Sequence, residues 1–351
     1  MSAPARIAIA GLGWVALHRH LPAILRHPDL RLVGVIDRHE GLAEHVAREY
    51  DLPHFQQADT LDGLPWINEI DAITIGAPPT AHEKLALSAL CQKKHVLTEK
   101  PFALTTEQAE AMAQAAQQNG ITLSVVHNFQ FARSLRKLHR DIQAGKLGRL
   151  RRIAATQLGN PKRRLPVWYE SLPCGLFFDE SPHFFYLLNN LCGNGLTLQT
   201  AYQVPDETGR NTPRLAHLLY KGGDGLPVTI SCQFDSTLSE WHVTVTGEKE
   251  TAIVDIFRDI YIRLPNDSSH KALDILRTSL YACAQHFWQH VPNGLALARG
   301  RMDYGNDEII DRFARAIHTG QNDEKIGFPQ ALAVLKLQLN AIKALQDATI
   351  A

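Results

Sequence analysis

The chain places an ion pair and a proline directly after a short apolar segment. Residues 95–98 (HVLT) are typical of a buried β-strand, and Glu99, Lys100 and Pro101 follow at once. In a doubly wound α/β sheet, ligands bind outside the carboxyl ends of the strands. Lys100 is therefore a candidate to face a cofactor, with Glu99 fixing its charge and direction. Pro101 locks the turn, and its X-Pro bond is a candidate for the cis form. A surface ion pair that contributes little is the alternative interpretation.

A second group of residues follows the first predicted strand. Residues 7–16 combine an apolar strand with a G-x-G-x-x-A turn at Gly11, Gly13 and Ala16. The first glycine makes the tight turn, the second lets the backbone approach a pyrophosphate, and the small third residue allows close packing. The helix that follows offers free N–H groups to phosphate. The pattern predicts a dinucleotide site, and a β–α turn without a ligand is the alternative.

An acidic residue stands where the ribose of a dinucleotide is expected. Asp37 ends the second predicted strand, 21 residues after Ala16. A carboxylate in that place accepts hydrogen bonds from the ribose hydroxyls and repels a 2′-phosphate, which favours NAD. The neighbouring Arg38 could neutralise such a phosphate, so NADP stays open as the second cofactor.

The elements that must position these residues alternate between strand and helix. Continuously apolar strands separated by helices indicate a parallel sheet that is covered on both faces. The pair Asn119-Gly120 marks the end of the last of these helices. The predicted strands are residues 7–10, 30–36, 71–76, 95–98 and 121–126, and the predicted helices are a stretch to about 27, 41–50, 81–92 and 105–118.

The second part of the chain has a different pattern. Apolar and polar residues alternate between turns, which predicts a largely antiparallel sheet with one open face. We therefore expect a doubly wound domain over residues 1–125 and an α+β domain over residues 126–351, whose last helix packs back on the first domain. The predicted strands are residues 196–204, 214–220, 227–234, 241–247, 250–257 and 259–264, and the predicted helices are 306–318 and 329–346.

The composition excludes several classes of protein. The formal net charge of zero gives no electrostatic reason for a nucleic-acid or anionic-membrane partner. No apolar run approaches the roughly 20 residues of a membrane span, and the start of the chain lacks a signal-peptide pattern. Five scattered cysteines without a C-x-x-C pair indicate neither a disulfide framework nor a zinc site, so no metal is expected. We expect a soluble cytoplasmic protein with a small-molecule substrate.

Three motifs together resemble the Gfo/Idh/MocA oxidoreductases, a family that includes glucose–fructose oxidoreductase and inositol dehydrogenase. They are the G-x-G-x-x-A turn, residues 78–82 (PPTAH) and residues 95–101 (HVLTEKP), and the resemblance covers essentially the whole chain. It implies a Rossmann domain followed by an α/β domain with a large open sheet. It also implies that Lys100 lies beside the nicotinamide and the reacting hydroxyl. The expected cofactor contacts are Gly11, Gly13, Trp14, Val15, Asp37, Arg38, Pro78, His82, Glu99, Lys100 and Asn128.

Members of this family carry a D-x-x-x-H element, which is matched here by Asp179 and His183. Ser181 is a good N-cap and Pro182 suits the first helical position, so His183 falls in the first turn of a helix that should run to about Leu191. The helix dipole there disfavours a protonated imidazole, and a near-neutral histidine suits a general base. The resemblance implies that His183 takes the substrate's proton while Asp179 orients its ring. A capping histidine beside a structural carboxylate is the alternative.

The sequence departs from the family pattern around this element, which leaves the polyol contacts and the substrate open. The departures are Cys174 and Leu176 beside Gly175 in a poor glycine run, Ser181 in place of a glycine, Tyr186 in place of an acid and Gln130 in place of an arginine. Residues 161–164 (PKRR) followed by Trp168 and Tyr169 could grip an anionic group and stack a sugar or base, and a solvated basic loop is the alternative. The expected substrate contacts are Lys100, Asn128, Arg163, Arg164, Trp168, Tyr169, Asp179 and His183.

The resemblance implies hydride transfer between nicotinamide and a hydroxyl or keto carbon of a sugar, cyclitol or nucleotide-sugar. Two alternatives stay open: a redox-neutral NAD-dependent epimerase or glycosidase, and a non-catalytic regulator that senses NAD. The retention of Lys100, Asp179 and His183 together argues against a regulator, because a sensor needs no proton-transfer set. The family commonly assembles through the open sheet of the second domain, so the resemblance implies a homodimer or homotetramer formed through that sheet.

Overall fold

The structure of the chain is a computed structural model that describes residues 3–163, 165–193, 195–299 and 304–348. The chain divides into two compact units. The first contains residues 1–128 and 306–336, and the second contains residues 129–305 and 337–351. The first unit therefore takes in a segment from the C-terminal part of the chain.

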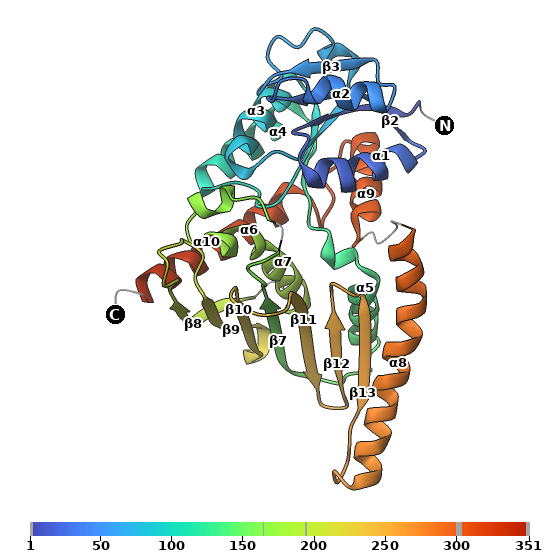
Figure 1. The fold of residues 1–351 in the computed structure, drawn as a ribbon, viewed down its shortest axis with the longest axis vertical. Helices are drawn as coiled ribbons and strands as arrows, with labels where there is room; N and C mark the ends of the chain where they lie inside the picture. Colours follow the sequence, from blue (N-terminus) through green and yellow to red (C-terminus); the bar gives the residue numbers. More distant parts are fainter. Residues whose placement is uncertain (1–2, 164, 194, 300–303, 349–351) are drawn as a thin grey trace. The chain divides into compact units, whose positions relative to one another are not determined.

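The first unit is built on a six-stranded parallel sheet with the order β3-β2-β1-β4-β5-β6 (Figure 1). Its central strands form because they are continuously apolar, and Ile7, Ile9 and Ile73 are fully buried. The order reverses between β1 and β4, so the loops after these two strands lie at the switch point where ligands bind in such sheets. The strands are β1 (Ala5–Ala10), β2 (Leu30–Asp37), β3 (His54–Gln57), β4 (Ala72–Ile75), β5 (His95–Thr98) and β6 (Leu123–Val125).

Helices connect these strands and cover the sheet. A π-helical turn, Ala16–His20, leads directly into α1, and 3-10 turns occur at Ile67–Glu69 and Pro79–Ala81. Thr105 caps α4 by accepting the Gln108 N–H, and Gly120 ends it at φ +66°, as the sequence predicted. The helices are α1 (Leu21–Arg26), α2 (Leu42–Glu49), α3 (His82–Cys91), α4 (Thr106–Asn119) and α9 (Asn306–Thr319), and α9 packs on α1 and β1.

The second unit is built on a seven-stranded sheet with the order β13-β12-β11-β7-β10-β9-β8. Its strand pairs are antiparallel except for β7 with β10, which is parallel. Ile153 at the centre pairs with Val228 on one side and Val245 on the other, and all three are fully buried. The strands are β7 (Leu150–Leu158), β8 (Thr197–Val204), β9 (Leu215–Lys221), β10 (Pro227–Gln233), β11 (Glu240–Gly247), β12 (Glu250–Asp255) and β13 (Ile260–Pro265).

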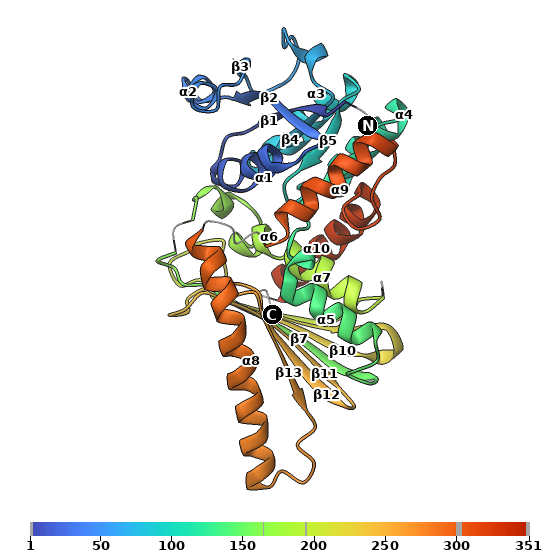
Figure 2. The same ribbon diagram turned by 90° about the vertical axis from the view of Figure 1, so that its right-hand side faces the viewer.

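Helices α5 and α7 lie on one side of this sheet, and α8 runs beside β13 (Figure 2). The last helix, α10, passes from the first unit into the second near residue 336. The helices are α5 (Arg133–Gln143), α6 (Leu176–Glu180), α7 (Pro182–Leu191), α8 (Ala272–Ala298) and α10 (Phe328–Ala348), and 3-10 turns lie at Phe129–Phe131, Trp168–Ser171 and Gly223–Gly225.

The predicted fold class is confirmed, with a parallel Rossmann sheet and a second, mostly antiparallel sheet. Five helices and strands were not predicted from the sequence, namely β3, α5, β7, α6 and α8. The most important of these is β7, because it lies at the centre of the second sheet and makes the parallel pair.

Candidate functional site

The two glycines after β1 differ in how closely other parts of the protein approach them. Gly11 has φ +79°, and a Cβ atom there would lie 2.6 Å from the Ala77 backbone nitrogen, so only glycine fits between the loops after β1 and β4. At Gly13 the nearest atom to such a Cβ would be the Gly76 carbonyl oxygen at 3.5 Å, which is ordinary contact. The protein itself therefore does not require glycine at position 13. In dinucleotide sites, a glycine at this position lets the protein backbone approach the pyrophosphate.

Asp37 holds the glycine turn in place. It is buried at the end of β2, and its Oδ2 accepts the Leu12 N–H at 2.7 Å. Its Oδ1 accepts the His39 N–H at 2.8 Å and lies 2.7 Å from His39 Nδ1. A carboxylate has about four lone-pair positions, so these contacts leave room for a ribose hydroxyl. The next residue, Arg38, is exposed.

Two further residues of the predicted cofactor site lie at the start of the first helix. Trp14 is 60% exposed, its ring stacks on His18 at 4.9 Å, and the Arg19 guanidinium lies over it at 5.2 Å. Val15 is half-buried beside it. The exposed Trp14 ring thus stands next to the turn that holds Gly13.

Glu99 makes a buried contact that the sequence analysis did not foresee. Its Oε1 lies 2.9 Å from His20 Nε2, and its Oε2 accepts the Lys100 N–H at 3.1 Å. Burial acts to raise the pKa of Glu99, but the hydrogen bond and charge of His20 and the charge of Lys100 outweigh it, and the net pKa is lowered. The π-helical turn brings His20 inward. Lys100 itself is half-buried, and the Lys100–Pro101 bond is cis, as the sequence suggested.

His82 ties together two loops at the carboxyl ends of the strands. It is fully buried, with Nε2 2.9 Å from the Ala77 carbonyl oxygen and Nδ1 2.9 Å from the Pro101 carbonyl oxygen. Burial lowers its pKa. His82 therefore links the loop after β4, which contains Pro78, to the Lys100 turn after β5. Asn128, the last residue of this part of the first unit, is buried after β6.

In the second unit, His183 lies in an aromatic cluster. It is buried in the first turn of α7, and its Nδ1 lies 2.7 Å from the Tyr186 hydroxyl. The same hydroxyl oxygen accepts the Phe129 N–H at 3.0 Å. The Phe129 ring stacks on His183 at 4.2 Å, and Trp241 meets it edge-on at 5.5 Å. These contacts fix both the position and the rotation of the imidazole.

The helix before His183 begins after a glycine that the close packing of the chain requires. Asp179 is half-buried on α6, which begins after Gly175 at φ +49°. A Cβ atom at Gly175 would lie 2.2 Å from Thr212 Oγ1, so the close approach of Thr212 excludes any larger residue. Thr212 Oγ1 accepts the Leu176 N–H at 2.8 Å and donates to Glu170 at 2.8 Å. Thus the single retained glycine of the poor run has a structural role.

The prediction that Ser181 caps the helix of His183 was wrong in one respect. The helix starts at Pro182 and ends at Leu191 as predicted, but the Ser181 hydroxyl makes no capping bond. Ser181 has helical angles (φ −61°, ψ −28°) because α6 leads directly into α7, and its N–H donates to the Phe177 carbonyl. The N–H groups at the start of α7 are therefore less available than those at an isolated helix end. This weakens the prediction that the helix dipole disfavours a protonated His183.

Part of the positive charge of the predicted substrate loop is neutralised by an ion pair within the protein. Arg163 donates to Glu180, a buried carboxylate that also accepts from Gln157 on β7. Trp168 and Tyr169 are half-exposed and meet edge-on at 6.3 Å. Arg164 lies outside the described residues.

One cluster of potential metal ligands already contains a cation. Single ligand atoms of Glu240, His242 and Asp255 lie within 4.8 Å of one another. Arg258 donates to both carboxylates at 2.5–2.7 Å, and its hydrogen bonds lower the pKa of Glu240 to about 2. The guanidinium is thus the counter-ion of this cluster.

Each unit therefore brings together part of the predicted set. In the first, the Gly11–Gly13 turn, Asp37, His82 and the Glu99–Lys100 pair occupy the carboxyl ends of the parallel strands. In the second, Asp179 and His183 occupy consecutive helices. The contacts of His20, Phe129, Trp241 and Tyr186 were not predicted from the sequence. Of these four, only Tyr186, three residues after His183 on one helix, had a spacing that could have revealed its contact.

Comparison with known proteins is consistent with this arrangement. Residues 5–127 match a family model described as an oxidoreductase family with an NAD-binding Rossmann fold. The scyllo-inositol 2-dehydrogenase (NADP(+)) of Bacillus subtilis is 30% identical over 151 residues, which are 43% of this chain and 44% of that protein. The chain thus matches less than half the length of this curated relative. None of the described helices combines the length and hydropathy needed to cross a membrane.

Two solved structures share the fold over nearly their full length. UDP-N-acetylglucosamine 3-dehydrogenase GnnA from Acidithiobacillus ferrooxidans has a TM-score of 0.75 at 21% identity, over 99% of both chains. The WlbA dehydrogenase from Bordetella pertussis, solved with NADH and UDP-GlcNAcA, has a TM-score of 0.77 at 18% identity, over 99% of this chain and 97% of that one. At these identities the likeness establishes the two-domain fold.

Proposed function

We propose that the chain, whose residues 5–127 match the Gfo/Idh/MocA oxidoreductase family with its NAD-binding Rossmann fold, is an NAD(P)-dependent dehydrogenase or reductase of that family. Its substrate is a CH–OH or keto group of a sugar, cyclitol or nucleotide-sugar, which are the substrate classes named for its relatives. The observation that carries the proposal is the turn after β1. No protein atom crowds Gly13 there, and Asp37 holds the turn through the Leu12 N–H.

The residues of the first unit fit a dinucleotide. Gly11 and Gly13 keep the turn flat for the pyrophosphate, and the N–H groups at the start of the helix face it. Asp37 keeps about one acceptor position for a ribose hydroxyl, which favours NAD, while the exposed Arg38 is the residue that would accommodate NADP. When bound, the nicotinamide supplies the hydride acceptor or donor.

Lys100 and His183 handle the proton of the reacting hydroxyl in this proposal. The ammonium of Lys100 stabilises negative charge on the substrate oxygen, and Glu99 and His20 keep the turn before it rigid. His183 acts as the general base: with its Nδ1–H donated to the Tyr186 oxygen, Nε2 is the ring nitrogen that takes the proton. Asp179, one helical turn before, orients the ring or the substrate. In oxidation His183 would take the proton of the reacting hydroxyl, while a nicotinamide held by the first unit would supply the hydride acceptor.

The proposal is tested by following the absorbance of reduced nicotinamide with the purified chain. NAD⁺ and NADP⁺ are each offered with inositols, free sugars, uronic acids and nucleotide-sugars, and the matching ketones are offered with NADH and NADPH. We expect turnover with one substrate class and faster turnover with NAD⁺. Product analysis that shows a changed sugar without net NADH would replace the proposal by the redox-neutral alternative. Unchanged substrates in both directions would contradict it.

A further inference from the structure

Helix α8 presents amide side chains to the sheet. Gln285 exchanges two hydrogen bonds with the backbone of Arg263 on the edge strand β13, and Gln289 does the same with Tyr261, all at 2.7–3.0 Å. Asn293 donates to two carbonyls of the turn before β13 and is the one buried residue of this helix, all of which is described. Figures 1 and 2 both show α8 alongside β13. The amides occupy the free edge of the strand, so this edge is closed to strand addition.

The opposite side of α8 is apolar and exposed. Leu273, Leu276, Leu280, Cys283 and Phe287 follow one another at alternating spacings of three and four, which is the seam of a helix that packs on another helix. A surface helix normally turns its apolar stripe to the core and its polar face to water, and α8 does the reverse. The large exposed apolar side chains of α8 are Leu273, Ile275, Leu276, Leu280, Tyr281, Phe287, Trp288, Val291, Leu295 and Leu297.

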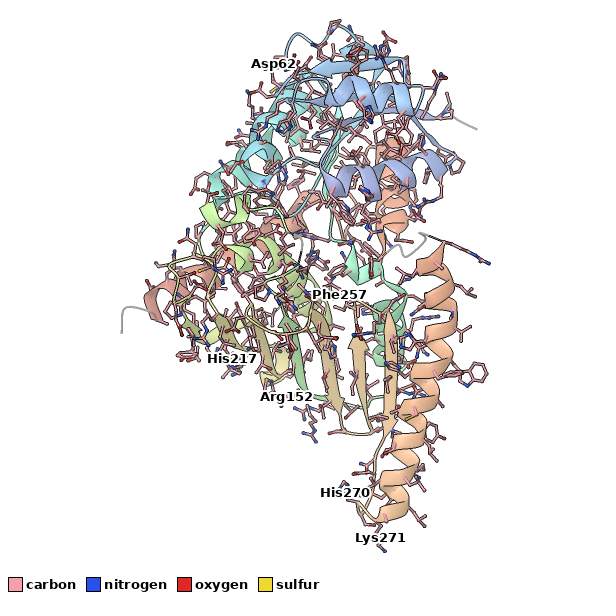
Figure 3. The ribbon with its side chains drawn as sticks, viewed as in Figure 1. Asp62, Arg152, His217, Phe257, His270 and Lys271 are labelled. Atoms are coloured by element: carbon pink, nitrogen blue, oxygen red, sulfur yellow. The ribbon has the colours of Figure 1, made fainter. Side chains whose placement is uncertain are left out.

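The exposed area has the size of an interface. At about 150–250 Å² for each large side chain, and at the exposed fractions observed, this group leaves roughly 1,000 Å² of apolar surface in water. The largest apolar patch of a typical monomer is about 300–600 Å², and a stable complex buries about 800 Å² on each partner. Figure 3 shows the turn of His270 and Lys271 from which α8 starts, beyond the end of the sheet, and the helix runs back from there for 27 residues, or about 40 Å.

The charges on α8 favour a protein partner. Asp274 and Arg277 are its only acidic and basic residues besides two histidines, so their formal charges cancel. A helix that lies on a membrane surface carries lysines and arginines along its polar face, and here that face holds the amides bound to β13. An uncharged apolar seam is best matched by a surface of the same kind.

The seam is also symmetric about its own middle. Leu280 and Phe287 are equally far from the point between Cys283 and Ala284, and so are Leu276 and Val291; the more distant Leu273 and Leu295 match to within one residue. An antiparallel copy of the helix would therefore place a large side chain of one copy opposite a large side chain of the other, with the small residues at the centre. Such self-complementarity is what a two-fold interface requires.

We propose that α8 is the surface through which a second copy of this chain binds, with the two α8 helices antiparallel and Cys283 near the two-fold axis. This proposal does not depend on the catalytic assignment. It differs from assembly through the open face of the sheet, where Leu219 on β9 is 36% exposed.

The first test compares the mass in solution of three proteins by light scattering after gel filtration. We expect the wild type at twice 39.1 kDa, because one two-fold interface joins two copies, and the double variant Leu280→Glu/Phe287→Glu at 39.1 kDa. Both side chains are more than half exposed, so the variant should keep its fold, which circular dichroism checks. Its subunit dissociation constant should rise by about a hundredfold or more. The control Leu219→Glu places the same charge on the open sheet face and should keep the wild-type mass.

The second test uses the exposed cysteines as distance probes. Cys283 and Cys91 are both exposed and free. A short bismaleimide should crosslink the wild type and Cys91→Ser to a dimer, and Cys283→Ser should give none. A monomeric wild type at micromolar concentration overturns the proposal, and so does a double variant that keeps its mass or a dimer that only Leu219→Glu splits. A monomer that sediments with vesicles of phosphatidylcholine and phosphatidylglycerol would also overturn it, in favour of a membrane surface.

Discussion

We predict that Tyr186→Phe slows turnover and shifts its dependence on pH. The Tyr186 ring is fully buried, and its hydroxyl contacts both His183 Nδ1 at 2.7 Å and the Phe129 N–H at 3.0 Å. The substitution removes one oxygen atom and keeps the ring, so the aromatic packing around His183 stays. The effect should therefore come from the lost hydrogen bond.

The direction follows from which form of His183 the oxygen stabilises. The Tyr186 oxygen accepts the Nδ1–H more strongly when the imidazole is protonated, because the bond is then charge-assisted. Without it, His183 loses its proton more readily, and the rising limb of the oxidation rate against pH moves to lower pH. A difference of about 1 kcal/mol between the two forms corresponds to about 0.7 pH unit. Loss of ring orientation should lower the plateau kcat by about five- to tenfold.

The matched control is Tyr220→Phe in the same unit. Tyr220 is also buried, and its hydroxyl has no hydrogen-bond partner in the part of the chain that the structure describes. The same chemical change there should leave the pH profile and kcat unchanged. The assay is kcat and kcat/KM in the oxidation direction from pH 5 to 10, with the melting temperature measured for each variant. An unchanged limb in Tyr186→Phe, or equal shifts in both variants, would refute the role of Tyr186.

Three further predictions concern charged groups. Lys100→Met should abolish turnover while the NADH dissociation constant changes by less than about tenfold. The control Lys84→Met removes only an exposed ion pair and should keep normal turnover. Normal turnover without Lys100 would contradict its catalytic role. Asp37→Asn should weaken NAD about tenfold more than NADP in a fluorescence titration, and an equal loss would remove the ribose contact. Arg258 holds the pKa of Glu240 at about 2 against an ordinary 4.5, so the wild type should lose this stabilisation as pH falls from about 4.5 towards 2. Arg258→Met should be about 1–3 kcal/mol less stable near pH 7 in urea melts and should converge with the wild type near pH 2; a constant gap would contradict this.

Apart from β3, the first unit was predictable because its strands are apolar and its turns carry specific residues, whereas β3 (HFQQ) is mostly polar. Gly11 and Gly120 both have the positive φ that a glycine in a turn or at a helix end predicts. The central strand β7 was missed because it begins with Leu150-Arg-Arg152 and continues with small residues, so it carries no strong alternation. Helix α8 was missed because its apolar residues do not face the core and its buried side consists of amides.

In the candidate site, too, some residues could be predicted from local sequence and others could not. Lys100 could be located from the residues of its own segment, because a strand end followed by an ion pair and a proline is a local pattern. The partner of Glu99 could not, because His20 lies 79 residues earlier, at the end of a π-helical turn that the sequence did not predict. Likewise the Phe129 and Trp241 rings reach His183 from distant segments, and no local pattern predicts such contacts.

The pairing of Arg163 bears on which substrates the second unit can recognise. A free arginine in this loop would favour an anionic substrate, because a guanidinium binds phosphate and carboxylate through paired hydrogen bonds. Here Arg163 already donates to Glu180, which is buried beside Gln157. Moving the guanidinium onto a substrate would break its ion pair with this buried carboxylate, and breaking such a pair costs about 3–5 kcal/mol when it is fully buried. The Trp168 and Tyr169 rings stay half-exposed and keep their capacity to stack. Among the described residues of this loop, stacking of a neutral ring is therefore better supported than capture of an anion by Arg163.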